Sequence, residues 1–185
     1  SYSATNKTYD GTSNVIVSES TSDIISGDTV TISENAAFDN KNVGINKTVN
    51  ISSISLTGTD ASNYNLVSST ATTTADITRL NSVTWTGGAT GNWFDPANWA
   101  GGAVPDLSNV ANVVIPTGTV ITFDTTGAVN PADASSAVNI DSLGTLGSLT
   151  ITNGELNISN SMTLDTFTQN GGILTAGSIT TDTLT

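Results

Sequence analysis

The feature that most constrains the fold is a short repeat near the C-terminal end of the chain. The repeated pairs, spaced 17 or 18 residues apart, are Leu149-Thr150, Phe167-Thr168 and Leu184-Thr185, together with Asn153-Gly154 and Asn170-Gly171. A fixed short period of β-favouring units is typical of stacked coils, and coils of this length suit a parallel β-helix. We therefore predict β-helix rungs over residues 113–185, with less regular coils between Val113 and Leu143. Because the repeat stops in mid-pattern, we expect the helix to be C-terminally truncated.

Each coil has too little apolar surface to be stable alone, so its inward residues must stack on those of the next coil. The predicted interior column consists of Leu149, Ile151, Leu156, Ile158, Met162, Leu164 and Phe167. Terminal coils expose hydrogen-bonding groups and core side chains, and therefore need a cap. We place a linker and a Trp-rich N-terminal cap at residues 80–112, with Leu80-Asn81-Ser82 as a short joint.

The Trp-rich stretch, residues 83–105, contains all three tryptophans of the chain. Aromatic faces can stack on sugar rings, and neighbouring amide and carboxylate groups can bind hydroxyls. The candidate carbohydrate-binding residues are Trp85, Trp93, Trp99, Asn92, Asp95 and Asn98. Burial of the indole rings as a structural plug is the alternative, because a small solenoid end needs bulky apolar filling.

Residues 1–79 alternate short apolar runs with turn signals, as small all-β domains do. The predicted strands are Val15–Val17, Val30–Ile32, Val49–Ile51, Ile54–Leu56, Tyr64–Leu66 and Ala75–Ile77. Apolar residues fall on odd positions at Val49 and Ile51 and on even positions at Ile54 and Leu56, so a bulge or turn is expected at Ser52-Ser53.

A tyrosine pattern favours an immunoglobulin-like β-sandwich for this first part. Asp60 to Leu66 match the Asp-x-small-x-Tyr-x-apolar sequence of a tyrosine corner, where the hydroxyl bonds to nearby backbone. An ordinary turn with a core tyrosine is the alternative, and a β-grasp-like topology would have nearly the same strand pattern. The predicted fold class is all-β: a small sandwich followed by a capped parallel β-helix.

Composition excludes several classes of function. The chain has no Cys and no His, and 16 acidic residues against 4 basic ones give a net charge of −12. We therefore expect no nucleic-acid partner, no membrane insertion, no cofactor or metal, and no Ser-His or Cys-His catalysis. One carboxylate pair, Asp165 and Asp182, falls in register on adjacent coils, but surface turns explain it as well. Lys41 and Lys47 are candidate donors for an intramolecular isopeptide crosslink, for which no partner is evident.

Three motifs in the first 79 residues resemble the YDG-type repeat of large bacterial exoproteins related to filamentous haemagglutinin: Tyr9–Thr12, Phe38–Gly44 and Leu56–Asp60 leading to Asn63-Tyr64. The W-x-G-G…N-W…N-W…P pattern downstream is similar to secreted bacterial β-solenoid proteins. The resemblance implies a non-enzymatic stalk segment of a secreted surface or biofilm-matrix adhesin, exported by two-partner secretion through an outer-membrane transporter. From the Trp-rich stretch, we expect polysaccharide or a surface glycan of a host or neighbouring cell as partner. A carbohydrate-binding module and, as a further alternative, a β-helical polysaccharide-active enzyme fragment stay open.

Overall fold

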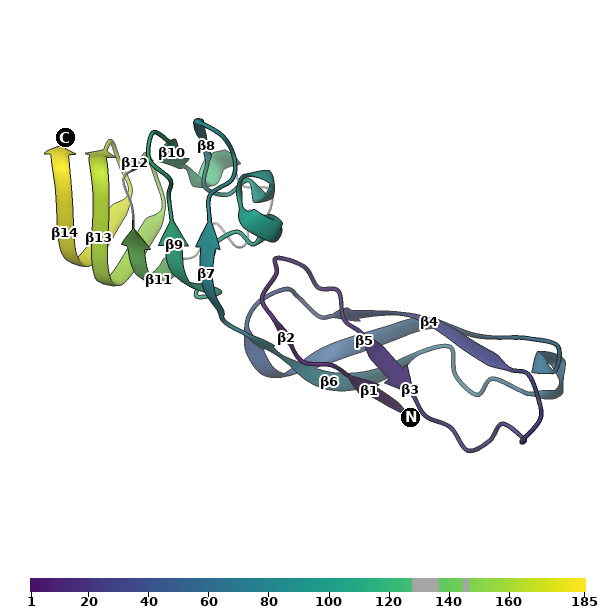
Figure 1. The fold of residues 1–185 in the computed structure, drawn as a ribbon. Helices are drawn as coiled ribbons and strands as arrows, with labels where there is room; N and C mark the ends of the chain where they lie inside the picture. Colours follow the sequence, from purple (N-terminus) through teal and green to yellow (C-terminus); the bar gives the residue numbers. More distant parts are fainter. Residues whose placement is uncertain (128–136, 145–146) are drawn as a thin grey trace. The chain divides into compact units, whose positions relative to one another are not determined.

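The computed structural model describes residues 1–127, 137–144 and 147–185 (Figure 1). Within these residues the chain is all-β, with short 3-10 turns and no α-helix, and no helix that could cross a membrane is found. The chain divides into two compact units. Unit 1 comprises residues 1–8 and 12–78, and unit 2 comprises residues 9–11 and 79–185.

Unit 1 contains two sheets, one of two strands and one of four. The smaller pairs β1 (Tyr2–Ala4) with β3 (Val17–Glu19) in antiparallel fashion. The larger has the order β2-β6-β5-β4, with β2 at Lys7–Thr8, β4 at Thr31–Phe38, β5 at Gly44–Thr57 and β6 at Ala71–Thr78. The pairing of β2 with β6 is parallel and the other two pairings are antiparallel.

The predicted phase switch in the middle of this sheet is confirmed as a β-bulge in β5. The register with β4 shifts between Ser33 and Asn35, and Ser53 has a positive φ of 55°. Ile51 on one side of the bulge and Ile54 on the other are therefore both buried, although they are three positions apart in the sequence. An extra residue in one strand re-aims its side chains, which is how the two apolar phases share one core.

The strand predicted at Tyr64–Leu66 is wrong, because these residues lie outside every strand and follow a 3-10 turn, η1 (Ala61–Asn63). The Tyr64 hydroxyl accepts a hydrogen bond from the Ile25 amide at 2.8 Å and donates one to Asp28 Oδ2 at 2.7 Å. The tyrosine thus ties together two loops that are distant in sequence, whereas a tyrosine corner bonds to backbone close by. The sandwich and β-grasp-like topologies both stay predictions.

Unit 2 is one parallel sheet that curls, with the strand path β7-β9-β11-β13-β12-β10-β8 and β14 paired to β13. The strands are β7 (Leu80–Thr84), β8 (Thr90–Asn92), β9 (Val110–Val114), β10 (Val120–Phe123), β11 (Val138–Gly144), β12 (Ser148–Ile151), β13 (Glu155–Gln169) and β14 (Ile173–Leu184). A short 3-10 turn, η4 (Thr125–Gly127), follows β10. Leu80 to Ser82, predicted as a joint, belong to β7, because Leu80 and Ser82 pair in register with β9.

The sheet curls because β13 pairs along its first part with β11 and along its second part with β12. Registered partners along one side are Val83, Val113, Leu143, Met162 and Ile179. Their spacing decreases from thirty residues in the first two steps to nineteen and then seventeen. The predicted spacing of 17 or 18 residues therefore holds for the last step on this side and for Leu149, Phe167 and Leu184 on the other, and the earlier turns of the sheet are longer.

The predicted interior column is confirmed, since all seven of its residues are buried. They alternate along β12 and β13 and point to the same side as their partners on β10 and β11, such as Phe123 and Leu143. Within the range predicted as β-helix, residues 128–136 and 145–146 lie outside the described residues.

Candidate functional site: the tryptophan cluster

The tryptophans lie in and beside the long segment that connects β8 to β9. Two 3-10 turns shape this segment, η2 (Pro96–Asn98) and η3 (Ala100–Gly102), and Figure 1 shows them beside β7 and β8. Asp95 is the N-cap of η2 and accepts a hydrogen bond from the Ala97 amide at 3.0 Å, while Pro96 occupies the first helical position. An acidic N-cap followed by proline is a strong local start signal, so the sequence itself specifies this turn.

The three indole rings pack edge to face in one cluster. Trp99 is central, with its ring centroid 5.3 Å from that of Trp85 and 5.1 Å from that of Trp93. Trp93 and Phe94 both pack on Phe123 of β10, at 5.3 Å and 4.9 Å. Edge-to-face geometry suits the ring quadrupoles and adds to the stabilisation from burial.

Each indole N–H donates to a backbone carbonyl. Trp85 Nε1 bonds to Gly88 O at 2.9 Å, Trp93 Nε1 to Pro105 O at 2.9 Å, and Trp99 Nε1 to Trp93 O at 2.6 Å. A buried N–H group without a partner would be costly, so these hydrogen bonds allow each indole ring to be buried completely.

The amide side chains that were candidates for sugar hydroxyls hold this loop in place. Asn92 accepts from the Phe94 amide at 2.8 Å and donates to Asp124 O at 3.0 Å, and Asn98 donates to Asn92 O at 3.0 Å. A Cβ added at Gly87 would collide with the Asn98 side chain, so that glycine is required by close approach.

This arrangement favours the structural plug over a sugar platform. The exposed fractions of the residues Trp85, Trp93 and Trp99 are 2%, 0% and 2%. Stacking on a sugar requires an open aromatic face, and these buried rings pack edge to face on one another, with Trp93 also packed on Phe123. The polar groups beside them are also engaged, so ligand binding here would require the loop to open.

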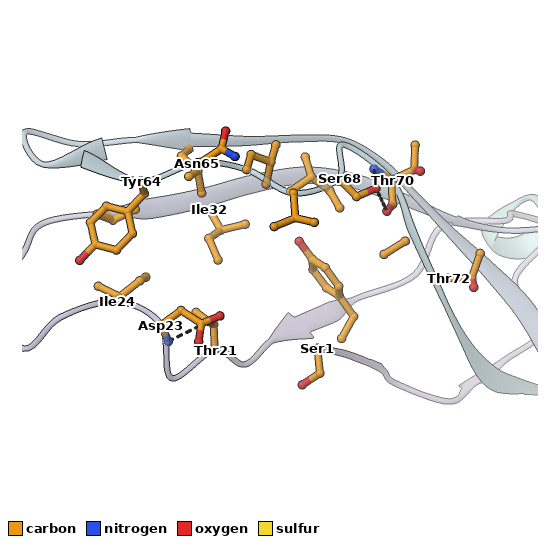
Figure 2. Close-up of a pocket in the computed structure, with 17 residues that line it drawn as sticks. Ser1, Thr21, Asp23, Ile24, Ile32, Tyr64, Asn65, Ser68, Thr70 and Thr72 are labelled. Atoms are coloured by element: carbon orange, nitrogen blue, oxygen red, sulfur yellow. Dashed lines mark hydrogen bonds between the residues drawn. The ribbon is translucent and has the colours of Figure 1, made fainter. Parts of the chain in front are cut away.

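A cavity of about 550 Å³ lies in unit 1 (Figure 2). Its walls are mainly apolar side chains of the four-stranded sheet and of the loops around residues 21–24 and 64–68, including Ile24, Ile32 and Ile54. The polar groups at its rim bond to one another: Thr21 with Asp23, and Ser68 with Thr70. The cavity can hold an apolar group, but these rim groups bond to one another and do not converge on a ligand.

The other chemical candidates from the sequence take ordinary structural places. The pairs on either side of Asp165 in the β13–β14 register place it opposite Asp182, as the repeat predicts. Asp182 is exposed. Lys47 lies 2.9 Å from Asp39 Oδ1 and donates to Asn40 Oδ1 at 2.8 Å. The hydrogen bond from Lys47 lowers the pKa of Asp39. The carboxylate therefore stays ionised and is a poor proton donor for crosslink formation at Lys47.

Two residues of unit 2 make structural contacts that were not predicted from the sequence. Arg79, the only arginine, donates to both carboxylate oxygens of Asp141 at 2.9 and 3.0 Å and to the carbonyls of Val110 and Asn139 at 2.9 and 3.3 Å. It thereby links the starts of three parallel strands. Tyr9 is buried in unit 2, ninety-five positions before its carbonyl partner Val104. A lone arginine at a domain boundary was an available signal, whereas nothing local in the sequence connects Tyr9 with Val104.

Comparison with known proteins yields one similarity. No curated protein and no solved structure was found to match the chain. Residues 1–75, less than half of the chain, match the family model of the YDG domain, which confirms the YDG-type resemblance of the N-terminal part.

Proposed function

We propose that this chain is a structural segment of the stalk of a secreted bacterial surface or biofilm-matrix adhesin, and that unit 2 forms rungs of a parallel β-helix. The observation that supports the proposal most directly is the continuous parallel register of unit 2. It runs from β7 and β8 through β13 to β14 and contains a buried apolar column. In stacks of this kind each turn contacts only its neighbours, so the stack grows along one axis, as an extended stalk requires.

The aromatic cluster supports the same role. A stalk segment needs its first turn to be filled and its edge closed, since open turns expose backbone groups and core side chains. The cluster supplies this with three buried rings whose N–H groups are all bonded. The YDG domain match is compatible with a modular exoprotein. Two-partner secretion and an outer-membrane transporter as partner are part of the same proposal.

Single-molecule force spectroscopy on the full chain, held at residues 1 and 185, tests the stalk role. We expect unit 2 to unfold as one event that releases roughly 38 nm of contour length from its 107 residues between 79 and 185, at about 3.6 Å per extended residue. Unit 1 should give a separate, shorter release. Stepwise peeling of unit 2 at forces below those that unfold unit 1 would contradict a load-bearing function.

A glycan array probed in parallel separates the carbohydrate-binding alternative from the stalk. Because the rings are buried, we expect no glycan signal that depends on the Trp cluster. Binding that is lost in Trp93→Phe, in a protein that keeps its thermal stability, would favour the binding module and contradict the proposal for this segment.

A further inference from the structure

Three residues next to the N-terminal strands belong to the second unit. Tyr9, Asp10 and Gly11 are part of unit 2, although Thr8 and Thr12 on either side belong to unit 1. The Tyr9 side chain is 1% exposed, and its hydroxyl donates to Val104 O at 2.9 Å and to Asp106 Oδ1 at 3.1 Å. The tyrosine therefore lies in a closed socket with two acceptors.

The socket is built around a buried acid. Asp106 is 3% exposed, and its Oδ1 also accepts a hydrogen bond from Asn109 Nδ2 at 2.7 Å. The backbone is folded back on itself here, with the Asp106 amide bonded to Val104 O at 2.8 Å and the Asn109 amide to Asp106 O at 3.0 Å. Burying a carboxylate is costly unless donors surround it, so this loop favours a hydroxyl donor at the position that Tyr9 occupies.

A second contact recognises Gly11. Its φ is +77°, and a Cβ added to it would collide with the carbonyl oxygen of Gly102 and lie 3.3 Å from the Cα of Ala103. Two features require glycine at this position: its left-handed φ, and the close approach of the backbone at Gly102 and Ala103, which leaves no room for a Cβ. The recognised segment is therefore residues 9–11, held at the Tyr9 hydroxyl and at the Gly11 backbone.

The structure assigns a peptide-recognition site to the loop of residues 102–109: its ligand is residues 9–11 of the same chain, held through the Tyr9 hydroxyl and the close approach of the Gly11 backbone. Occupancy of the site is coupled to the tryptophan cluster, because Trp93 Nε1 donates to the carbonyl of Pro105, between the two acceptors of Tyr9. The assignment does not depend on the stalk or adhesin function.

Nitration of tyrosines by tetranitromethane, mapped by mass spectrometry on the full chain, tests the site. Tyr2 and Tyr64 are half-buried and serve as internal references. We expect Tyr9 to react much more slowly than both. In Asp106→Ala and in Gly11→Ala the Tyr9 rate should rise about tenfold, the change expected when one hydrogen bond to a charged group or an equivalent contact is lost.

Two matched variants separate recognition from general damage. Gly118 has φ +78° with open space around its Cβ position, so Gly118→Ala introduces the same backbone strain in unit 2 without the collision. Asp165→Ala removes an acid from β13 of the same unit. Both should leave Tyr9 protected. Equal rates for Tyr9 and Tyr64 in the unmodified protein, or unchanged protection in Asp106→Ala, would overturn the assignment.

Proton NMR of the indole N–H groups gives an independent readout with a variant that keeps the ring. Tyr9→Phe should speed hydrogen exchange of the Trp93 indole about tenfold and leave that of Trp85, which bonds to Gly88, unchanged. Unchanged exchange at Trp93 would overturn the coupling. If the protein is a dimer and its dissociation exposes Tyr9, residues 9–11 bind the loop of a second copy, and the assignment of a ligand from the same chain is overturned.

Discussion

Replacement of Trp93 by alanine tests whether the aromatic cluster is a structural plug. The side chain is fully buried, contacts the rings of Trp99 and Phe123, and bonds to Pro105 O. Trp93→Ala removes about 200 Å² of buried surface, or about 5 kcal/mol at 25 cal/mol per Å². Large-to-small substitutions at aromatic core sites cost about 3–5 kcal/mol, and the Pro105 carbonyl also loses its donor.

We therefore expect unit 2 to lose about 4 kcal/mol of unfolding free energy. Unit 2 has 110 residues, from residues 9–11 and 79–185, and for this size about 4 kcal/mol corresponds to a decrease in Tm of about 15 °C. Urea unfolding followed by near-ultraviolet circular dichroism, which reports the packed indoles, measures the free energy, and calorimetry measures Tm.

Val120→Ala is the matched control, since Val120 lies on β10 of the same unit with 43% of its side chain exposed. Surface truncations of this kind change stability by about 0.5 kcal/mol or less. A loss below about 1 kcal/mol in Trp93→Ala, with a cooperative transition retained, would refute the plug and return the ring to the list of binding residues.

Three smaller perturbations follow from other contacts. Arg79→Met should lower the unfolding free energy of unit 2, measured by urea titration, by about 1–2 kcal/mol. The value is kept small because the Arg79 and Asp141 side chains are 34% and 41% exposed and solvent weakens their attraction. An unfolding free energy of the native protein that is equal in low and high salt would argue against the ion pair. Ser53→Gly should stabilise unit 1 by about 0.5–1 kcal/mol by relieving a left-handed φ, and a lower Tm would show that the bulge is not strained. The folded pKa of Asp39 is lowered from 3.8, so its ion pair with Lys47 stabilises unit 1 above pH 3.8, and this stability is lost as the pH falls through the folded pKa. The difference in unfolding free energy between the native protein and Lys47→Met should therefore decrease in acid. A difference that does not change with pH would contradict this.

The sequence was most informative where a local pattern decides the structure. The phase change between Ile51 and Ile54 could be satisfied only by an irregularity, and β5 has its bulge there. The 17-residue repeat likewise fixed which residues of β12 and β13 point inward, because registered positions in a parallel stack share one face. Both predictions needed only the period of apolar residues.

The sequence was least informative where distant segments meet. A short apolar run around Tyr64 reads equally well as a strand or a loop, and only the contacts with Ile25 and Asp28 place it in a loop. The longer spacing between Val83 and Val113 carries no repeat, so the first turns of the sheet could not be counted. Tyrosine 9 illustrates the limit best, because its partners at Val104 and Asp106 follow from tertiary structure alone.

The two ends of the curled sheet differ in a way that explains the position of the aromatic cluster. At β14, Ile179 and Leu184 are 45% and 66% exposed although their register partners on β13, Met162 and Phe167, are buried. A strand paired with β14 would bury them, as β13 buries the residues of β11 and β12. At β7 and β8 the long connection to β9 folds back and fills the first turn with indole rings instead of with another turn of sheet. The thirty-residue spacing between Val83 and Val113 includes this connection, so the length of that first turn contains the chain that closes this end of the curled sheet.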